Sequence, residues 1–172
     1  MTAGGTPEPA PTGRLDLVPL RVEDADEMAV VLADPALHAF IGGEPEDAEL
    51  LRARYARQTA GSPDPAQAWF NWVLRLRAED RLVGYVQATV TERGRVAEVA
   101  WVVGTPWQGR GLAGEAARAL VDALAAAGVE LVVAHVHPGH RASGAVAASA
   151  GLHRTGLVHD GEDRWELRLS PR

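Results

Sequence analysis

Alternating apolar and polar positions recur along this chain and predict β-strands, because successive side chains of a strand point to opposite faces of its sheet. The alternation first appears near the N-terminus and then three times between residues 69 and 103, with turn residues in between. Residues 131–136 are almost continuously apolar, as expected of a strand at the centre of a sheet. The predicted strands are 14–20, 69–76, 82–89, 96–103, 131–136, 152–158 and 164–169.

Helical signals lie between several of these strands. Acidic residues at 23–26 suit the positive end of a helix dipole, and Pro35 ends that segment. An Ala-rich segment later in the chain stops before Gly128, which is typical of a helix C-terminus. The predicted helices are 23–34, 45–55, 113–127 and 141–150. This order of strands and helices predicts a fold of the α/β class in its α+β form.

The chain divides into a short tail and one domain. Residues 1–13 are rich in Pro, Gly and Thr, which predicts a disordered tail. Residues 14–172 are predicted to form a single domain, since this length is sufficient for a core of its own.

The stretch 104–114 reads Gly-Thr-Pro-Trp-Gln-Gly-Arg-Gly-Leu-Ala-Gly and joins a predicted strand to the Ala-rich helix. Gly109, Gly111 and Gly114 lack side chains, so backbone N–H groups there can approach an anion closely. The following helix directs the positive end of its dipole to the same place. We interpret this stretch as a phosphate-binding loop.

Three other interpretations of this loop stay open on the residues alone. Gly109–Gly114 matches the GxGxxG motif of dinucleotide-binding folds. Those folds need an acidic residue at the end of the next strand to bind the ribose, but Glu130 precedes that strand here. Gly104 and Gly109 have P-loop spacing, but Arg110-Gly111 stand where Lys and Ser/Thr would bind a γ-phosphate and Mg²⁺. The third interpretation is a Gly-rich turn that only caps a helix.

Composition excludes several kinds of chemistry. All 17 basic residues are arginine and there is no cysteine, which excludes lysine Schiff bases, thiol nucleophiles, disulfides and Cys-ligated zinc. A net charge of −6 argues against nucleic acid as a partner and fits a cationic amine substrate. With no run of about 20 apolar residues and no basic-then-apolar N-terminal signal, we expect a cytoplasmic protein without a membrane partner.

Motifs in a consistent order resemble those of the Gcn5-related N-acetyltransferase (GNAT) family over about residues 14–169. Gln108-x-x-Gly111-x-Ala113 is similar to the family's Q/R-x-x-G-x-G/A, which cradles the pyrophosphate of acetyl-CoA. Three further segments resemble the branch of ribosomal-protein N-terminal alanine acetyltransferases: Leu-x-Leu-x-Pro-Leu at 15–20, Ala-Glu-Val-Ala-Trp-Val-Val at 97–103, and His-Pro-x-x-x-Ala-Ser at 137–143. The resemblance implies a GNAT fold with a twisted, mixed, mostly antiparallel sheet of about seven strands and about four helices. It also implies acetyl-CoA as cosubstrate.

The resemblance further implies where the cofactor binds. In family members, the strand that corresponds to residues 96–103 separates from its parallel neighbour near a bulge, which would lie around Trp101–Val103 here. Free backbone groups can then pair with the pantetheine arm. The pyrophosphate would then lie on residues 109–114, where Arg110 either adds a charge or is only solvated. The expected cofactor contacts are Trp101, Val102, Val103, Gln108, Gly109, Arg110, Gly111, Leu112, Ala113, Gly114, His140 and Ser143.

Amine acetylation needs one group to accept a proton and another to donate one. Glu98 is the candidate base, a lone carboxylate among apolar residues where burial would favour its uncharged form, and the similar branch uses a glutamate there through a water. A solvated outward charge is the alternative. The tyrosine that many members use as acid is Ala147 here, whereas Ser143 matches a serine proposed in the branch or else binds backbone. His140 replaces a cofactor-contacting asparagine and is a competing acid.

The acceptor amine is expected to contact Phe40, Trp69, Trp72 and Glu98. Phe40 anchors a predicted loop at 38–44, and the two tryptophans lie on a strand that should flank the acceptor groove. Packing in the core is the alternative for the tryptophans.

His135, His137 and His140 raise a metal site as a second hypothesis, because histidines at such spacing can ligate a metal. No carboxylate lies nearby in sequence, so the ligand set is incomplete and we predict no metal.

The sequence thus predicts an N-acetyltransferase that moves an acetyl group from acetyl-CoA to a primary amine, on a protein N-terminus or a small molecule, within a ternary complex. A non-catalytic acyl-CoA sensor on the same fold is the alternative, followed by a dinucleotide-dependent oxidoreductase. A homodimer is common in the branch that the chain resembles.

Overall fold

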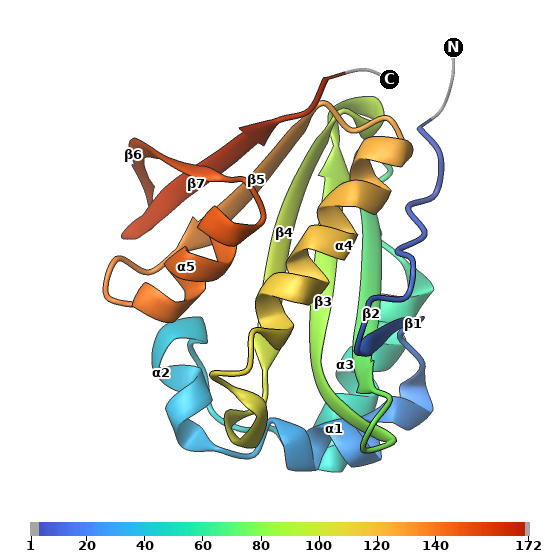
Figure 1. Cartoon of the computed structure of the whole chain (residues 1–172). Coiled ribbons are helices and arrows are strands. Elements are labelled where there is room, and N and C mark those ends of the chain that lie inside the picture. The colour runs from blue at the N-terminus through green and yellow to red at the C-terminus, as the bar shows by residue number, and fades with distance from the viewer. Residues whose placement is uncertain (1–3, 171–172) are drawn as a thin grey trace.

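A seven-stranded mixed sheet forms the centre of the computed structural model, which describes residues 4–170 (Figure 1). The strand order is β1-β2-β3-β4-β5-β7-β6. The strands are β1 (Leu15–Pro19), β2 (Ala68–Leu76), β3 (Arg81–Thr91), β4 (Val96–Val103), β5 (Leu131–Val136), β6 (His153–His159) and β7 (Glu162–Arg168). Only β4 and β5 pair in parallel within the described chain, and the other neighbours are antiparallel. This topology confirms the predicted fold class. It also excludes a dinucleotide-binding fold, whose mostly parallel sheet needs successive βαβ units, because β4-α4-β5 is the one parallel βαβ unit in the described chain.

Helices cover both faces of the sheet (Figure 1). They are α1 (Ala25–Val31), α2 (His38–Ile41), α3 (Ala48–Ala60), α4 (Leu112–Ala126) and α5 (Arg141–Ser149), with short 3₁₀ turns at Val22–Asp24, Pro35–Leu37, Glu92–Gly94 and Thr105–Trp107. The structure therefore has one helix more than the four predicted, because α2 lies where the sequence predicts a loop.

The core lies between α4 and the central strands, and it is built from the apolar positions that alternation assigned to one face. α4 buries Leu112, Leu120 and Leu124 completely or nearly so. From the sheet, Val86 and Ala97 are fully buried. Burying each such side chain contributes about 1–3 kcal/mol, so this layer holds α4 and its preceding loop in place.

Residues 4–13 form a strap along α4 where the sequence predicted a disordered tail. The Gly5 N–H donates to the Ala127 carbonyl over 3.0 Å at the end of α4, and Pro7 is buried. At its other end, Thr12 donates to Glu115 in the first turn of α4. These contacts give the strap an ordered path, and the prediction for residues 1–3 lies outside the described residues.

Candidate functional site

β4 and β5 pair only at their N-terminal ends and then diverge (Figure 1). The parallel register joins Val96–Glu98 to Leu131–Val133 and stops there. The separation therefore begins directly after Glu98, earlier than the predicted Trp101–Val103. The expected bulge is not in β4 either, since β3 and β4 stay in continuous register. Beyond Glu98, the β4 backbone facing β5 is available to an extended ligand.

The loop predicted to bind phosphate follows the diverging end of β4 and leads into α4. Gly109 and Gly111 adopt positive φ angles of 79° and 77°, which a side-chain-bearing residue adopts only with strain. Within residues 4–170, no protein group accepts from the N–H groups of residues 109–114. Six unpaired N–H groups at the start of a 15-residue helix form a strong anion-binding geometry.

Side-chain hydrogen bonds from three residues of this loop, Trp107, Gln108 and Arg110, hold it to the neighbouring strands and turn. The Trp107 ring is buried, and its indole N–H reaches the Glu79 carboxylate over 3.5 Å. The same carboxylate accepts from the Arg110 guanidinium over 3.2 Å, so this side chain lies toward the β2–β3 turn. Gln108 donates its side-chain amide to the Val103 carbonyl over 3.0 Å, which ties the loop to the end of β4.

Gly114 allows α4 and α5 to approach closely. A Cβ at this position would lie 2.9 Å from the Ser149 hydroxyl of α5 and 3.3 Å from the Arg118 guanidinium. The small residues of both helices thus bring the N-terminal half of α4 beside α5, which borders the separation between β4 and β5.

Ser143 of α5 contacts the side chain of Trp101 of β4. The Trp101 indole N–H donates to the Ser143 hydroxyl over 3.1 Å. A serine hydroxyl can accept this bond and still donate its own proton to another group. Trp101 and Ser143, both predicted cofactor contacts, are thus brought together across the separation between the strands.

Glu98 lies on the opposite face of the sheet from α4 and pairs with His135 of β5. Glu98 Oε1 and His135 Nδ1 are 3.0 Å apart. The Glu98 side chain is 57% exposed, so the expectation that it is buried among apolar residues is wrong. The His135 side chain is 12% exposed, and its Nε2 is buried with no partner among the described residues. From the sequence alone, His135 was raised as a possible metal ligand, with a structural or cofactor-contacting role as the alternative, and this pair was not predicted.

Phe40 of α2 packs against the two histidines that follow β5. Its ring stacks on His140 at a centroid distance of 4.2 Å and lies 5.2 Å from His137. Burial, with a smaller contribution from the neighbouring His137, lowers the pKa of His140 below its ordinary value of 6.5. His135 faces Glu98 instead, so the three histidines of the metal hypothesis do not converge. No group of three potential metal ligands occurs in residues 4–170.

The two tryptophans predicted to contact the acceptor lie on opposite faces of β2. The pairings Trp69↔Thr89 and Thr89↔Glu98 place Trp69 on the Glu98 face. Trp72 is 5% exposed and belongs to the core, so the expectation that it lines an acceptor groove is wrong. Trp69 is half-buried, and its indole N–H donates to Gln67 over 3.3 Å.

In the part of the chain that the structure describes, no helix combines the length and apolarity needed to cross a membrane.

Comparison with known proteins gives one family match and many structural neighbours. Residues 14–153 match the family model described as an acetyltransferase (GNAT) domain. The fold is similar to RimL, a ribosomal L7/L12 α-N-protein acetyltransferase in complex with coenzyme A, with a TM-score of 0.78 and 13% identity over 94% of this chain and 97% of that one.

Two further structures show the same fold. A spermidine N-acetyltransferase from Vibrio cholerae, in complex with CoA and spermine, has a TM-score of 0.73 and 19% identity over 92% of this chain and 97% of that one. A GNAT-family acetyltransferase from Bacillus anthracis has a TM-score of 0.74 and 20% identity over 90% and 93%. A search of curated proteins found no match.

Proposed function

The chain belongs to the GNAT acetyltransferase family and is an acetyltransferase, and on this premise we propose that it moves the acetyl group of acetyl-CoA to a primary amine. The transfer is direct, with both substrates bound at once. Two features of one place support the proposal. The pairing of β4 with β5 stops at Glu98, and the unpaired N–H groups of residues 109–114 lie at the end where these strands have separated.

The cofactor arrangement follows from this geometry. We propose that the pyrophosphate binds the N–H groups of residues 109–114, where the α4 dipole adds favourable charge. The pantetheine arm then pairs with the free edge of β4 beyond Glu98, as an added strand would. In this arrangement the thioester lies near Glu98, where β4 and β5 begin to separate. Complexes of RimL and of the spermidine acetyltransferase with CoA support acetyl-CoA as the cosubstrate.

Glu98 and Ser143 supply the proton transfers in this proposal. Glu98 accepts a proton from the substrate ammonium, directly or through a water, which frees the nitrogen lone pair. The amine then attacks the thioester carbonyl, the N–C bond forms, and the C–S bond breaks. The Ser143 hydroxyl, held by the Trp101 N–H, donates its proton to the leaving sulfur and regains one from the acetylated nitrogen, which loses a proton to become the amide. The 3.0 Å contact with His135 fixes the orientation of the Glu98 carboxylate.

The acceptor in this proposal is a cationic amine. A net charge of −6 favours the approach of cations, and Trp69 lies on the Glu98 face. Two classes of acceptor are to be compared. A polyamine is represented by the spermine bound to the spermidine acetyltransferase, and a protein N-terminus by the ribosomal protein that RimL is named for.

Glu98→Gln tests the proposal. Free-thiol release from acetyl-CoA is measured with three amines: spermine, an aminoglycoside and a peptide with a free N-terminus. We expect wild-type turnover with at least one amine and a fall of about 100-fold in kcat for Glu98→Gln, the usual contribution of a general base. Acetyl-CoA affinity should not change.

Glu92→Gln is the control, because this exposed carboxylate lies in the β3–β4 turn and pairs only with Arg95. Unchanged kcat in Glu98→Gln would remove Glu98 as the base. Tight acetyl-CoA binding without turnover for any amine would favour the non-catalytic sensor.

A further inference from the structure

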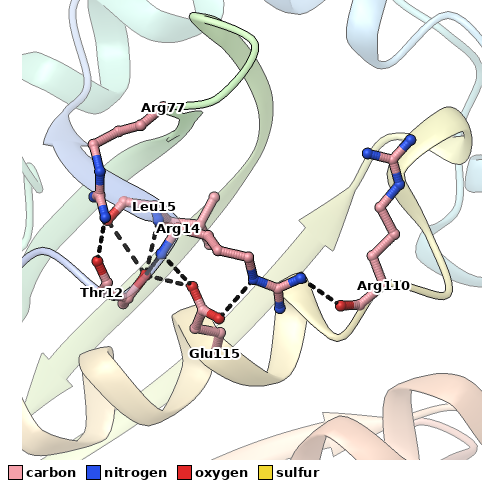
Figure 2. Close-up of polar contacts among 6 residues, drawn as sticks. All are labelled: Thr12, Arg14, Leu15, Arg77, Arg110 and Glu115. Carbon is pink, nitrogen blue, oxygen red and sulfur yellow. Dashed lines mark hydrogen bonds and ion pairs between the residues drawn. The ribbon is translucent and has the colours of Figure 1, made fainter.

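Arg14 links the N-terminal strap to the loop predicted to bind phosphate. Its guanidinium makes two contacts at once (Figure 2). Nε lies 3.0 Å from Glu115 Oε1 in the first turn of α4, and Nη1 donates to the Arg110 carbonyl over 2.9 Å. The Arg110 side chain extends away toward Glu79, so Arg14 holds the backbone of the loop and not its charged side chain.

Glu115 is the fixed end of this contact. Its Oε2 accepts from the Thr12 hydroxyl over 2.5 Å and from the Arg14 backbone N–H over 3.1 Å. Burial acts to raise the pKa of Glu115, but these hydrogen bonds and the Arg14 charge outweigh it and hold that pKa below the ordinary value. The carboxylate is therefore ionised at neutral pH and orients Arg14 with a charge-assisted bond.

The geometry of a peptide unit connects this contact to ligand binding. In a trans peptide the C=O and the following N–H point in opposite directions. A hydrogen bond that fixes the Arg110 carbonyl toward Arg14 therefore points the Gly111 N–H away from Arg14. That N–H is one of the unpaired donors at the start of α4. Gly111 has a positive φ, and glycine can adopt several other backbone conformations as readily. A contact from outside the loop is therefore needed to select the conformation that fixes the direction of the Gly111 N–H.

We propose that Arg14 is a positioning residue for the cofactor pyrophosphate: by holding the Arg110 carbonyl it aims the Gly111 N–H at the anion. The inference rests on the proposed function, since it takes acetyl-CoA as the ligand. It assigns Arg14, which directly follows the strap, and the strap's Thr12 a role in cofactor affinity beyond packing.

Two ligands and three variants test the inference. Dissociation constants are measured for acetyl-CoA by calorimetry and for S-acetylpantetheine, which lacks the pyrophosphate, by NMR titration. Arg14→Ala should weaken acetyl-CoA binding about tenfold, the effect of impairing one hydrogen bond to a charged group. Its affinity for S-acetylpantetheine should match that of the wild type. Arg14→Lys should resemble Arg14→Ala, because one ammonium cannot bridge both contacts with the planar fork of a guanidinium.

Arg77→Ala is the matched control. Arg77 also holds the strap, because it donates to the Thr12 carbonyl, and it binds Asp16 of β1 at 2.9 Å. Its side chain lies on the far side of Thr12 from the loop (Figure 2). This variant should loosen the strap and keep wild-type affinity for both ligands.

Three results would overturn the inference: unchanged acetyl-CoA affinity in Arg14→Ala, an equal loss for both ligands, or wild-type affinity in Arg14→Lys, which would indicate a direct charge effect. A wild type that does not bind acetyl-CoA would overturn the proposed function as well, so the two failures are distinguishable.

Discussion

Gly84 of β3 is the position at which a single added methyl group should damage the sheet next to β4, the strand that we propose pairs with the cofactor. The register between β2 and β3 shifts at Leu74/Arg75, beside the pairing of Leu74 with Gly84. On its other side, Gly84 faces the backbone of β4 at close range. A Cβ on Gly84 would lie 2.1 Å from the Val102 carbonyl oxygen and 2.9 Å from the Val103 Cα. Both obstacles are backbone atoms, which cannot move away as a flexible side chain can.

The size of the effect follows from these distances. Relieving the overlap in Gly84→Ala requires β3 and β4 to separate locally by about 1 Å, which lengthens the neighbouring ladder hydrogen bonds. Overpacking typically costs about 1–3 kcal/mol, and the backbone obstruction places this variant at or above about 3 kcal/mol. For a domain of this size about 1 kcal/mol corresponds to about 2–4 °C, so Tm should fall by about 6–12 °C.

Thermal unfolding followed by circular dichroism measures this effect. Gly13→Ala is the control, because a Cβ there meets nothing within 4 Å and its Tm should stay within about 1 °C of the wild type. A Tm loss below about 2 °C in Gly84→Ala would refute the close approach of β3 and β4.

Two other predictions concern His140 and Ser143, which lie at the proposed cofactor site. Because the pKa of His140 is lowered, its neutral form stabilises the fold above pH 6.5, and this contribution is lost as the pH falls through the lower folded value. The Tm of the wild type should therefore fall more between pH 7 and about pH 5 than that of His140→Phe, which keeps the stack on Phe40; equal losses would contradict the prediction. Ser143→Ala should lower kcat about 100-fold in the thiol-release assay with little change in acetyl-CoA affinity, and unchanged kcat would remove the hydroxyl as the acid.

Alternation predicted β1 to β4 correctly because the face of these strands that lies under α4 is the more deeply buried one, so its apolar positions repeat with the period of a strand. The Gly-rich loop and α4 were also predictable from local residues, since positive φ angles and an Ala-rich helix leave clear signals. α2 was missed because four residues are too few to show helical periodicity.

Side-chain placement was predictable only in part. Trp69 and Trp72 are three positions apart, so period-2 alternation already assigns them to opposite faces, and this signal could have shown that only one of the two can line the acceptor groove. The exposure of Glu98 was not predictable, since Ala97 and Val99 beside it are compatible with either face.

Contacts between distant segments left no local signal. Arg14 and Arg110 are 96 positions apart, and Glu79 and Arg110 are 31 apart. Charged residues at such distances look like solvated surface in the sequence, and only the fold shows that they hold the loop. The order of the strap depends in the same way on Ala127 and Glu115, far along the chain.

The measurement that tests the account most directly is calorimetric titration of the purified protein with acetyl-CoA, with NAD and NADP titrated separately under the same conditions. The account predicts micromolar affinity for acetyl-CoA and no binding of either dinucleotide. Binding of a dinucleotide, or of none of the three ligands, would contradict the assignment of residues 104–114 as the pyrophosphate loop of an acetyltransferase.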